Sequence, residues 1–308
     1  MNTLVEPVSD AVPDSPVTAV GAIHPVRPFL WSVRRELWEN RSIYVAPLIA
    51  AGVFLFGCLV SARRLAVWLR HIDASDQSRA AATYAAPFFG DMVILLTALV
   101  VAVFYCLGAL HNERRDRSIL FWKSLPVSDL TTVAAKASIP LVVLPVISLA
   151  IALVTHLIVV GLNTAVLASV GLAPQGPTQL PVLDQIGMLI YGVFTLTLWH
   201  APAYAWFLLV SVWARRAPFL WAFGLPIAAT IFEMVAFGTS VIGSFFWKRL
   251  APGINEAFSA THSGPGGVIL PQIDLIGFFG NPGLWIGLVV AAALLAGCVW
   301  LRRYREPV

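Results

Sequence analysis

The chain has 308 residues, of which 58% are apolar and only 12% are charged, with a formal net charge of +4 at pH 7. Soluble globular domains have roughly 45–50% apolar and about 25% charged residues, so this composition excludes a soluble domain, and it also excludes a disordered chain. An outer-membrane barrel is disfavoured because its strands alternate apolar and polar residues. The composition predicts an all-α, multi-pass integral membrane protein, and the small net charge gives no reason to expect nucleic acid as a partner.

Residues 1–26 are predicted to be a flexible tail outside the membrane domain. They contain Glu6, Asp10 and Asp14 but no Lys or Arg. A secretory signal needs a basic start followed by a compact apolar stretch, and this segment has neither. We therefore expect no cleavage here.

Residues 27–41 (RPFLWSVRRELWENR) predict an amphipathic helix in the membrane interface. At helical spacing, the apolar side carries Phe29, Leu30, Val33, Leu37 and Trp38, and the polar side carries Arg34, Arg35, Glu36 and Glu39. The alternative is that this segment is only the basic flank of the next span.

Residues 42–305 are predicted to form a six-helix transmembrane domain. A helix needs about 20 apolar residues to cross a bilayer core of about 30 Å. Six stretches qualify, at about 43–60, 89–110, 138–162, 186–210, 219–241 and 283–301.

Basic residues predict the orientation of these spans. With a cytoplasmic N-terminus, the inside segments carry 14 of the 20 Lys and Arg residues and the outside segments carry 6. This bias predicts that both termini are cytoplasmic, in a bacterial inner membrane. The first outer loop, with four arginines, is the exception.

The longest predicted outer loop covers about residues 242–281. It alternates short apolar pieces with Gly and Pro, including Phe245–Trp247, Val268–Leu270 and Leu275–Phe279. Such pieces are typical of re-entrant or interfacial helices that dip into the outer leaflet. An ordered loop is the alternative.

The predicted cytoplasmic segment between spans two and three, residues 111–136, combines charges with exposed aromatics. A charge cluster is followed by an amphipathic stretch over 118–125, which Pro126 ends. Ser128 is predicted to cap the next helix. Aromatic anchors ringed by charges are typical of a protein–protein contact. The alternative is an interfacial helix resting on lipid, with Lys123 facing water.

The sequence ERRDRSILFWKSLPVSDLTTVAAK, residues 113–136, resembles the signature stretch of permease subunits of bacterial type-2 ABC (ATP-binding-cassette) transporters, the exporter-like class. The six spans, the interfacial helix and the broken loop before the last span match that family over about residues 27–305.

The resemblance implies an assembly of two permease subunits, identical or sister, with two ATPase subunits that hold ATP and Mg²⁺. The segment between spans two and three would be the coupling helix that enters a cleft of the ATPase, and the loop before the sixth span would hold re-entrant helices. The charged residues would meet the ATPase or brace the interfacial helix, the apolar ones would dock, and Lys123 and Pro126 would complete the contact. The charged set is Glu113, Arg114, Arg115, Asp116 and Arg117, and the apolar set is Phe121, Trp122 and Leu125.

No catalytic or metal-binding pattern appears in the sequence. The phosphate-loop pattern G-x-x-x-x-G-K-[ST] is missing, so this chain is not expected to be an enzyme or to bind a cofactor, and ATP would be hydrolysed by the partner. Cys58, Cys106 and Cys298 lie in apolar runs without short-spaced Cys or His partners, and we interpret them as apolar fillers.

Ionisable residues inside the spans are candidates for the translocation path or outer gate, because each is costly in lipid unless it is paired or hydrated. Glu233, in the outer half of the fifth span, is the clearest, and His156 and His200 are weaker. The alternative for Glu233 is a structural hydrogen bond, and for each histidine a packing role. Asp91 is interpreted as interfacial.

The sequence therefore favours a permease subunit of an ATP-driven exporter, with membrane lipids as its surroundings. Two alternatives remain: an ion-coupled secondary transporter, which usually shows internal repeats not seen here, and a non-transporting anchor or sensor that signals through an ATPase.

Overall fold

A computed structural model of the chain describes residues 26–71, 76–116, 127–169, 171, 182–251, 258–263 and 269–304. Six helices in these residues are long and apolar enough to cross a membrane, which supports an integral membrane protein. The spans are Ser42–Val67, Ala86–Arg115, Asp129–Ser169, Val182–Trp213, Pro218–Phe237 and Pro282–Tyr304. Five of the six predicted stretches lie inside these bounds. The fifth is shorter than predicted.

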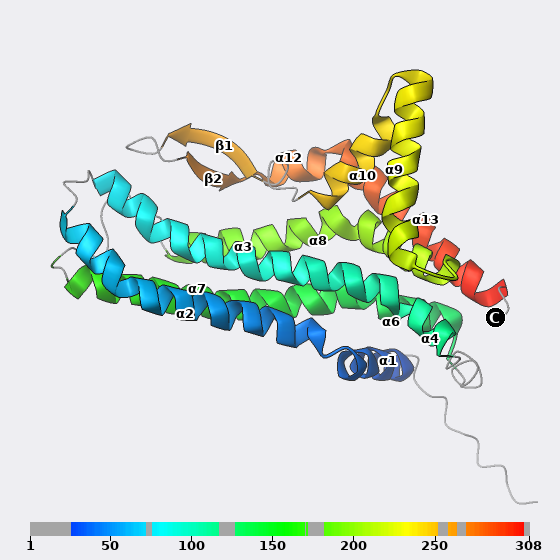
Figure 1. Ribbon diagram of the computed structural model, residues 1–308, viewed down its shortest axis with the longest axis horizontal. Coiled ribbons are helices and arrows are strands. Elements are labelled where there is room, and N and C mark those ends of the chain that lie inside the picture. The colour runs from blue at the N-terminus through cyan, green and yellow to red at the C-terminus, as the bar shows by residue number, and fades with distance from the viewer. Residues whose placement is uncertain are drawn as a thin grey trace, which may run out of the picture.

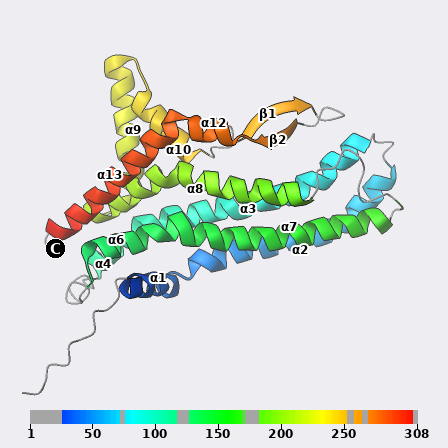
Figure 2. The same cartoon turned by 180° about the vertical axis from the view of Figure 1, so that it is seen from behind.

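Four long helices run side by side as a bundle (Figures 1 and 2). They are α2 (Ser42–His71), α3 (Asp76–Ala109), α7 (Leu144–Ser169) and α8 (Val182–Trp213). α6 (Asp129–Ser138) and a π-helical turn, η1 (Ile139–Val143), lead directly into α7. α13 (Pro282–Tyr304) packs along α8. Apolar residues dominate every face of these helices, as expected where lipid surrounds the bundle.

α9 (Pro218–Phe237) projects away from the bundle (Figure 1). Proline at its first position suits a helix start, because the missing N–H needs no partner there. It ends at Gly238, whose φ of 66° is left-handed and whose N–H donates to the Met234 carbonyl. The fifth span therefore stops four residues before the predicted residue 241, because the glycine reverses the chain.

In the segment before the sixth span, the described residues form two short helices and one hairpin. The helices are α10 (Val241–Leu250) and α12 (Leu275–Gly280). Between them, β1 (Phe258–Ser263) pairs antiparallel with β2 (Ile269–Ile273), with an irregular register between Ala260 and Ser263. The sequence prediction of an all-α chain with re-entrant helices did not include this hairpin.

One end of the bundle gathers several elements that are far apart in the sequence. There α1 (Val26–Glu39) packs on α6, and the last turn of α13 lies beside α6 as well, while α4 (His111–Arg115) continues from α3 (Figures 1 and 2). We call this region the α1–α6 end. The largest cluster of buried apolar side chains reaches it through Tyr105, Leu110 and Val133.

The apolar side predicted for α1 is divided between the bundle and the outside. Val33 and Leu37 pack against the core, whereas Leu30 and Trp38 are exposed. Glu36, predicted on the polar side, is buried. The buried Glu36 carboxylate forms an ion pair with Lys136. This long-range partner allows a charged side chain of α1 to face the bundle.

Candidate functional site

The α1–α6 end contains a cluster of buried charged side chains, and we call it the charge cluster. Glu113 lies at its centre, on the short helix that prolongs α3. Lys136 comes from the last turn of α6, and Arg302 from the last turn of α13. Glu36 reaches it from α1. Each side chain sits on a helix end or an amphipathic helix, where a charge remains close to the apolar spans without lying at their centre.

Glu113 joins three elements. Its carboxylate lies 2.9 Å from the Arg302 Nη1 atom, 3.1 Å from the Lys136 Nζ atom and 3.7 Å from the Arg35 Nη2 atom. The side chain is only 8% exposed. Because charged hydrogen bonds are stronger where water is scarce, these contacts hold α4 against α1, α6 and α13.

Lys136 also bonds Glu36, which extends the cluster into α1. The Lys136 Nζ atom lies 2.7 Å from Glu36 Oε1, and the two side chains are 3% and 4% exposed. The Tyr105 hydroxyl donates to the other Glu36 oxygen at 2.9 Å. Because Lys136 is shared between Glu36 and Glu113, the loss of one carboxylate changes the environment of the others, so the members act as a unit.

Arg302 completes the cluster by reaching the start of α6. Its Nε donates to Asp129 Oδ1 at 3.0 Å. Asp129 occupies the first turn of α6, and the preceding Ser128 caps that helix by accepting from the Thr131 N–H, which confirms the predicted cap. The start of α6 is thus fixed both locally and through α13.

The charge cluster holds both ends of the segment that links α4 to α6. α4 ends at Arg115 and α6 begins at Asp129, and both helices are bonded to Arg302. Through Glu113 and Asp129, Arg302 therefore ties α4 and the start of α6 to the last turn of α13.

The predicted coupling residues divide into described and undescribed ones. Glu113 lies in the cluster and contacts α1, which is the bracing alternative for this residue. Arg114 donates to the Val212 carbonyl, and Arg115 pairs with Asp116 at 3.2 Å on the exposed surface. Arg117, Phe121, Trp122, Lys123, Leu125 and Pro126 lie outside the described residues, so their docking role stays a prediction.

Sequence reasoning did not identify Glu36, Tyr105, Lys136 or Arg302 as parts of the site. In the sequence, Lys136 and Arg302 contribute only to the charge bias that predicts the orientation. The usable signal for these two residues is their position within one turn of a long apolar run, where a paired charge is far less costly than a free one.

A second polar group crosses the bundle interior between α3, α7 and α8. His156 Nδ1 lies 2.7 Å from Asp91 Oδ2, and His156 Nε2 lies 3.0 Å from Gln185 Oε1. When both ring nitrogens carry protons, the ring donates to both oxygens and forms an ion pair with Asp91. The Asp91 Oδ1 atom is buried and has no hydrogen-bond partner within the described chain.

The Asp91–His156 pair borders an apolar layer. Ile94, Ala152 and Leu189 lie one turn along the same three helices and belong to one buried cluster. Asp91 was interpreted from sequence as a simple interfacial residue, but it is only 6% exposed and is paired. The structure thus gives the predicted candidate His156 a partner that the sequence did not reveal.

Glu233 makes local hydrogen bonds to the start of α10. Its carboxylate accepts from the Val241 N–H at 2.6 Å, the Ile242 N–H at 2.9 Å and the Thr239 hydroxyl at 2.9 Å. A carboxylate at a helix N-terminus satisfies N–H groups that have no intrahelical partner. This is the structural alternative of the sequence analysis, and the gate role of Glu233 stays a prediction.

His200 lies beside a buried arginine on α10. Its Nδ1 atom is 2.7 Å from the Leu196 carbonyl. Arg249 donates to the carbonyls of Trp199 and Gly283, and its guanidinium stacks over the Trp199 ring at 4.0 Å. These contacts fasten α10 to α8 and α13 next to His200, which agrees with a packing role and leaves its path role a prediction.

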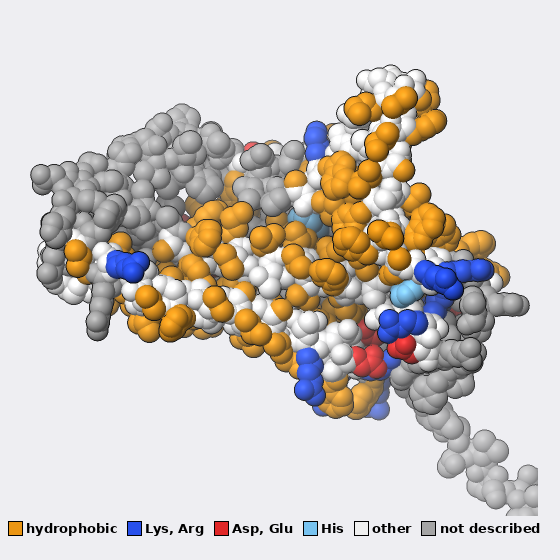
Figure 3. Space-filling view, viewed as in Figure 1, with side chains coloured by type: hydrophobic (Ala, Val, Ile, Leu, Met, Phe, Trp, Pro, Cys, Tyr) orange, Lys and Arg blue, Asp and Glu red, His pale blue; other side chains and the backbone are white. Residues whose placement is uncertain are grey.

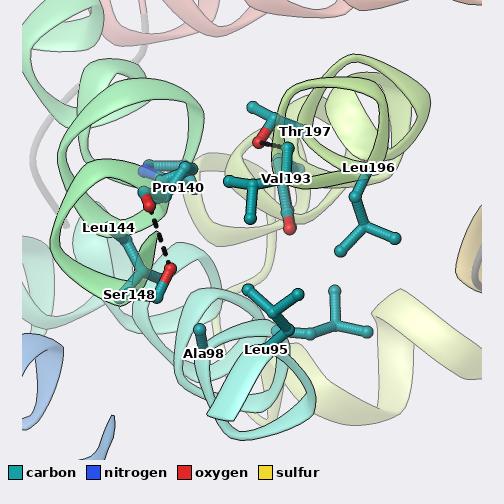
Figure 4. Close-up of a pocket in the computed structure, with 11 residues that line it drawn as sticks. Leu95, Ala98, Pro140, Leu144, Ser148, Val193, Leu196 and Thr197 are labelled. Atoms are coloured by element: carbon teal, nitrogen blue, oxygen red, sulfur yellow. Dashed lines mark hydrogen bonds between the residues drawn. The ribbon is translucent and has the colours of Figure 1, made fainter. Parts of the chain in front are cut away.

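A small cavity of about 20 Å³ lies between α3, η1 with α7, and α8 (Figure 4). Ser148 and Thr197 line it, and their hydroxyls donate to the backbone carbonyls of Pro145 and Val193. Such a volume holds about one water molecule. A cargo molecule does not fit there.

Comparison of the chain with protein-family models, curated proteins and solved structures gives no match. The six apolar helices and the charge cluster are therefore supported by the structure. An assignment to a transporter family is supported by the resemblance of residues 113–136 alone.

Proposed function

We propose that the chain is the permease subunit of an ATP-driven exporter of the type-2 ABC class. The observation that carries the proposal is the charge cluster, which ties both ends of the predicted coupling segment to the helices of the bundle. The motif of residues 113–136 and the six spans support the same assignment. In this proposal the α1–α6 end faces the cytoplasm, in keeping with the distribution of Lys and Arg.

The proposed mechanism uses the cluster as a brace. ATP binding closes two ATPase subunits, which displace the segment between α4 and α6. Because Glu113 and Arg302 hold that segment's ends, the displacement moves α3, α7 and α13 together rather than bending one loop. Nucleotide thus drives a change between two global states by binding them unequally. The small cavity inside one subunit suggests that cargo passes between two permease subunits.

The Phe121→Ala plus Trp122→Ala variant tests the docking contact. We expect the full-length variant to lose at least tenfold of the ATPase that co-purifies with it, because aromatic anchors carry most of an interface's energy. Quantitative mass spectrometry of the affinity-purified chain measures this. A matched control, Phe56→Ala plus Trp300→Ala, removes a Phe and a Trp that are exposed on the spans and should keep the ATPase. Equal ATPase recovery from both variants would refute the docking assignment.

The buried Asp91–His156 pair favours an ion-coupled secondary transporter as the second candidate. Ionisable pairs inside a membrane commonly mark ion pathways. If the chain is a secondary transporter, no ATPase should co-purify with the wild-type chain. Transport should then follow an ion gradient when ATP is absent. The same purification therefore separates the two functions.

A further inference from the structure

The acidic residues of α1 are neutralised within the chain. Glu36 pairs with Lys136 at 2.7 Å, and Glu39 pairs with Arg35 at 2.7 Å. Because both acidic residues of α1 are paired with basic residues, the remaining charge on this helix is positive. It comes from Arg27 and Arg34, with Arg41 following just after the helix.

The side of α1 that points away from the bundle combines this positive charge with apolar side chains. Leu30, Trp31 and Trp38 are 58%, 64% and 67% exposed. The Arg34 guanidinium lies 5.5 Å from the Trp31 ring centre and 4.8 Å from the Trp38 ring centre. We call Leu30, Trp31, Arg34 and Trp38 the outward face. Figure 3 shows hydrophobic and basic side chains next to each other where Figure 1 draws α1.

The Arg34 guanidinium lies within cation–π distance of both indole rings, which is a favourable contact. A guanidinium carries five N–H donors in a planar fork that matches the geometry of phosphate. Arg27 lies two turns before Arg34, so its charge is on the same side of the helix. The outward face therefore places positive charge directly beside exposed indole rings.

We propose that the outward face of α1 binds the phosphate of an anionic phospholipid. Arg34 donates its N–H fork to the phosphate oxygens, which is the geometry that arginine favours with phosphate. Trp31 and Trp38 lie at the level of the headgroups, and Leu30 reaches the acyl boundary, as in helices that lie in a membrane interface. The exposed Leu and Trp side chains favour a lipid over a free phosphate ion, which offers no apolar partner.

Lipid binding to the full-length chain tests this proposal. The chain is purified in a neutral detergent and titrated with phosphatidylglycerol or with phosphatidylcholine, and native mass spectrometry counts the retained lipid. Arg34→Gln is expected to weaken phosphatidylglycerol binding about fivefold, which is the usual effect of one basic side chain near an anionic surface. Phosphatidylcholine binding should weaken less, because the choline cation offsets the charge of its phosphate. Removing Arg27 and Arg41 as well should weaken it about 100-fold.

Three controls make the result decisive. Arg216→Gln removes an exposed arginine elsewhere and should not change lipid binding. Thermal unfolding of Arg34→Gln should match wild type, because Arg34 is exposed. Inorganic phosphate should not displace the lipid.

The proposal is overturned if Arg34→Gln binds phosphatidylglycerol as wild type does, or if inorganic phosphate displaces the lipid. It is also overturned if Arg34→Gln keeps its lipid but loses a co-purifying protein, since the outward face would then be a protein contact. These outcomes do not depend on the proposed transport function.

Discussion

Glu113→Gln is expected to lower the free energy of unfolding by about 1.5–3 kcal/mol, because it removes charged hydrogen bonds to Lys136 and Arg302, which keep their other partners. Glutamine keeps the size of the side chain, so the loss reports the charge rather than a cavity. Unfolding of the full-length chain in mild detergent, followed by circular dichroism against denaturant, measures the effect.

Glu39→Gln is the matched control for Glu113→Gln. Glu39 also pairs with Arg35, but its side chain is 49% exposed. An exposed pair of this kind contributes about 0.3–0.5 kcal/mol, so the control should remain close to wild type. If both variants lose the same small amount, the charge cluster does not hold the α1–α6 end together, and the brace in the proposed mechanism fails.

His156→Leu is expected to destabilise the chain by about 3–5 kcal/mol, because it leaves the Asp91 carboxylate buried without its ion-pair partner. The Asp91 Oδ1 atom already has no hydrogen-bond partner within the described chain, so little nearby can compensate the charge. Adding Asp91→Leu should restore most of the stability, because replacing both members with apolar residues removes the unpaired charge. Unfolding of the two single variants and the double variant measures the coupling between the two side chains.

The same three variants of Asp91 and His156 also separate a role in stability from a role in transport. If the pair serves packing alone, the double variant recovers both stability and the proposed transport. If His156 lies on the path, stability returns while transport stays lost. Strictly additive losses in the three variants would contradict the ion pair itself, because side chains that interact do not give additive effects.

The spans could be predicted from the sequence because a long apolar run is a local signal. Membrane helices must satisfy their own backbone, so each run of about 20 apolar residues specifies one element without knowledge of its neighbours. The start of the fifth span near residue 219 and the cap at Ser128 are local signals of the same kind. Reasoning from such signals misjudged the end of α9, because the apolar run continues past Gly238 while the backbone turns there.

The charge cluster could not be predicted in this way because its contacts are long-range. Glu113 and Arg302 are 189 residues apart, and Glu36 and Lys136 are 100 residues apart. Each charge alone looks like an ordinary flank of a span. Only the packing of α1, α6 and α13 brings them together, and this pairing also explains why Glu36 is buried against the pattern of its own helix.

Asp91 shows the same limit inside the membrane. Its place near the start of an apolar run is typical of an interfacial residue, and His156 is 65 residues away on another helix. A lone histidine among apolar residues is usually a packing residue. The pairing of the two makes both candidates for function, which neither residue is by itself.

A photo-crosslinking amino acid placed at Ser124 probes the proposed contact between this chain and its ATPase, because that position lies between the predicted docking residues and replaces none of them. After irradiation of intact cells, we expect a covalent adduct between this chain and a separate ATP-binding-cassette ATPase on the cytoplasmic side. An adduct with a protein outside the cell membrane, or with lipid or this chain alone, would refute the proposed permease function.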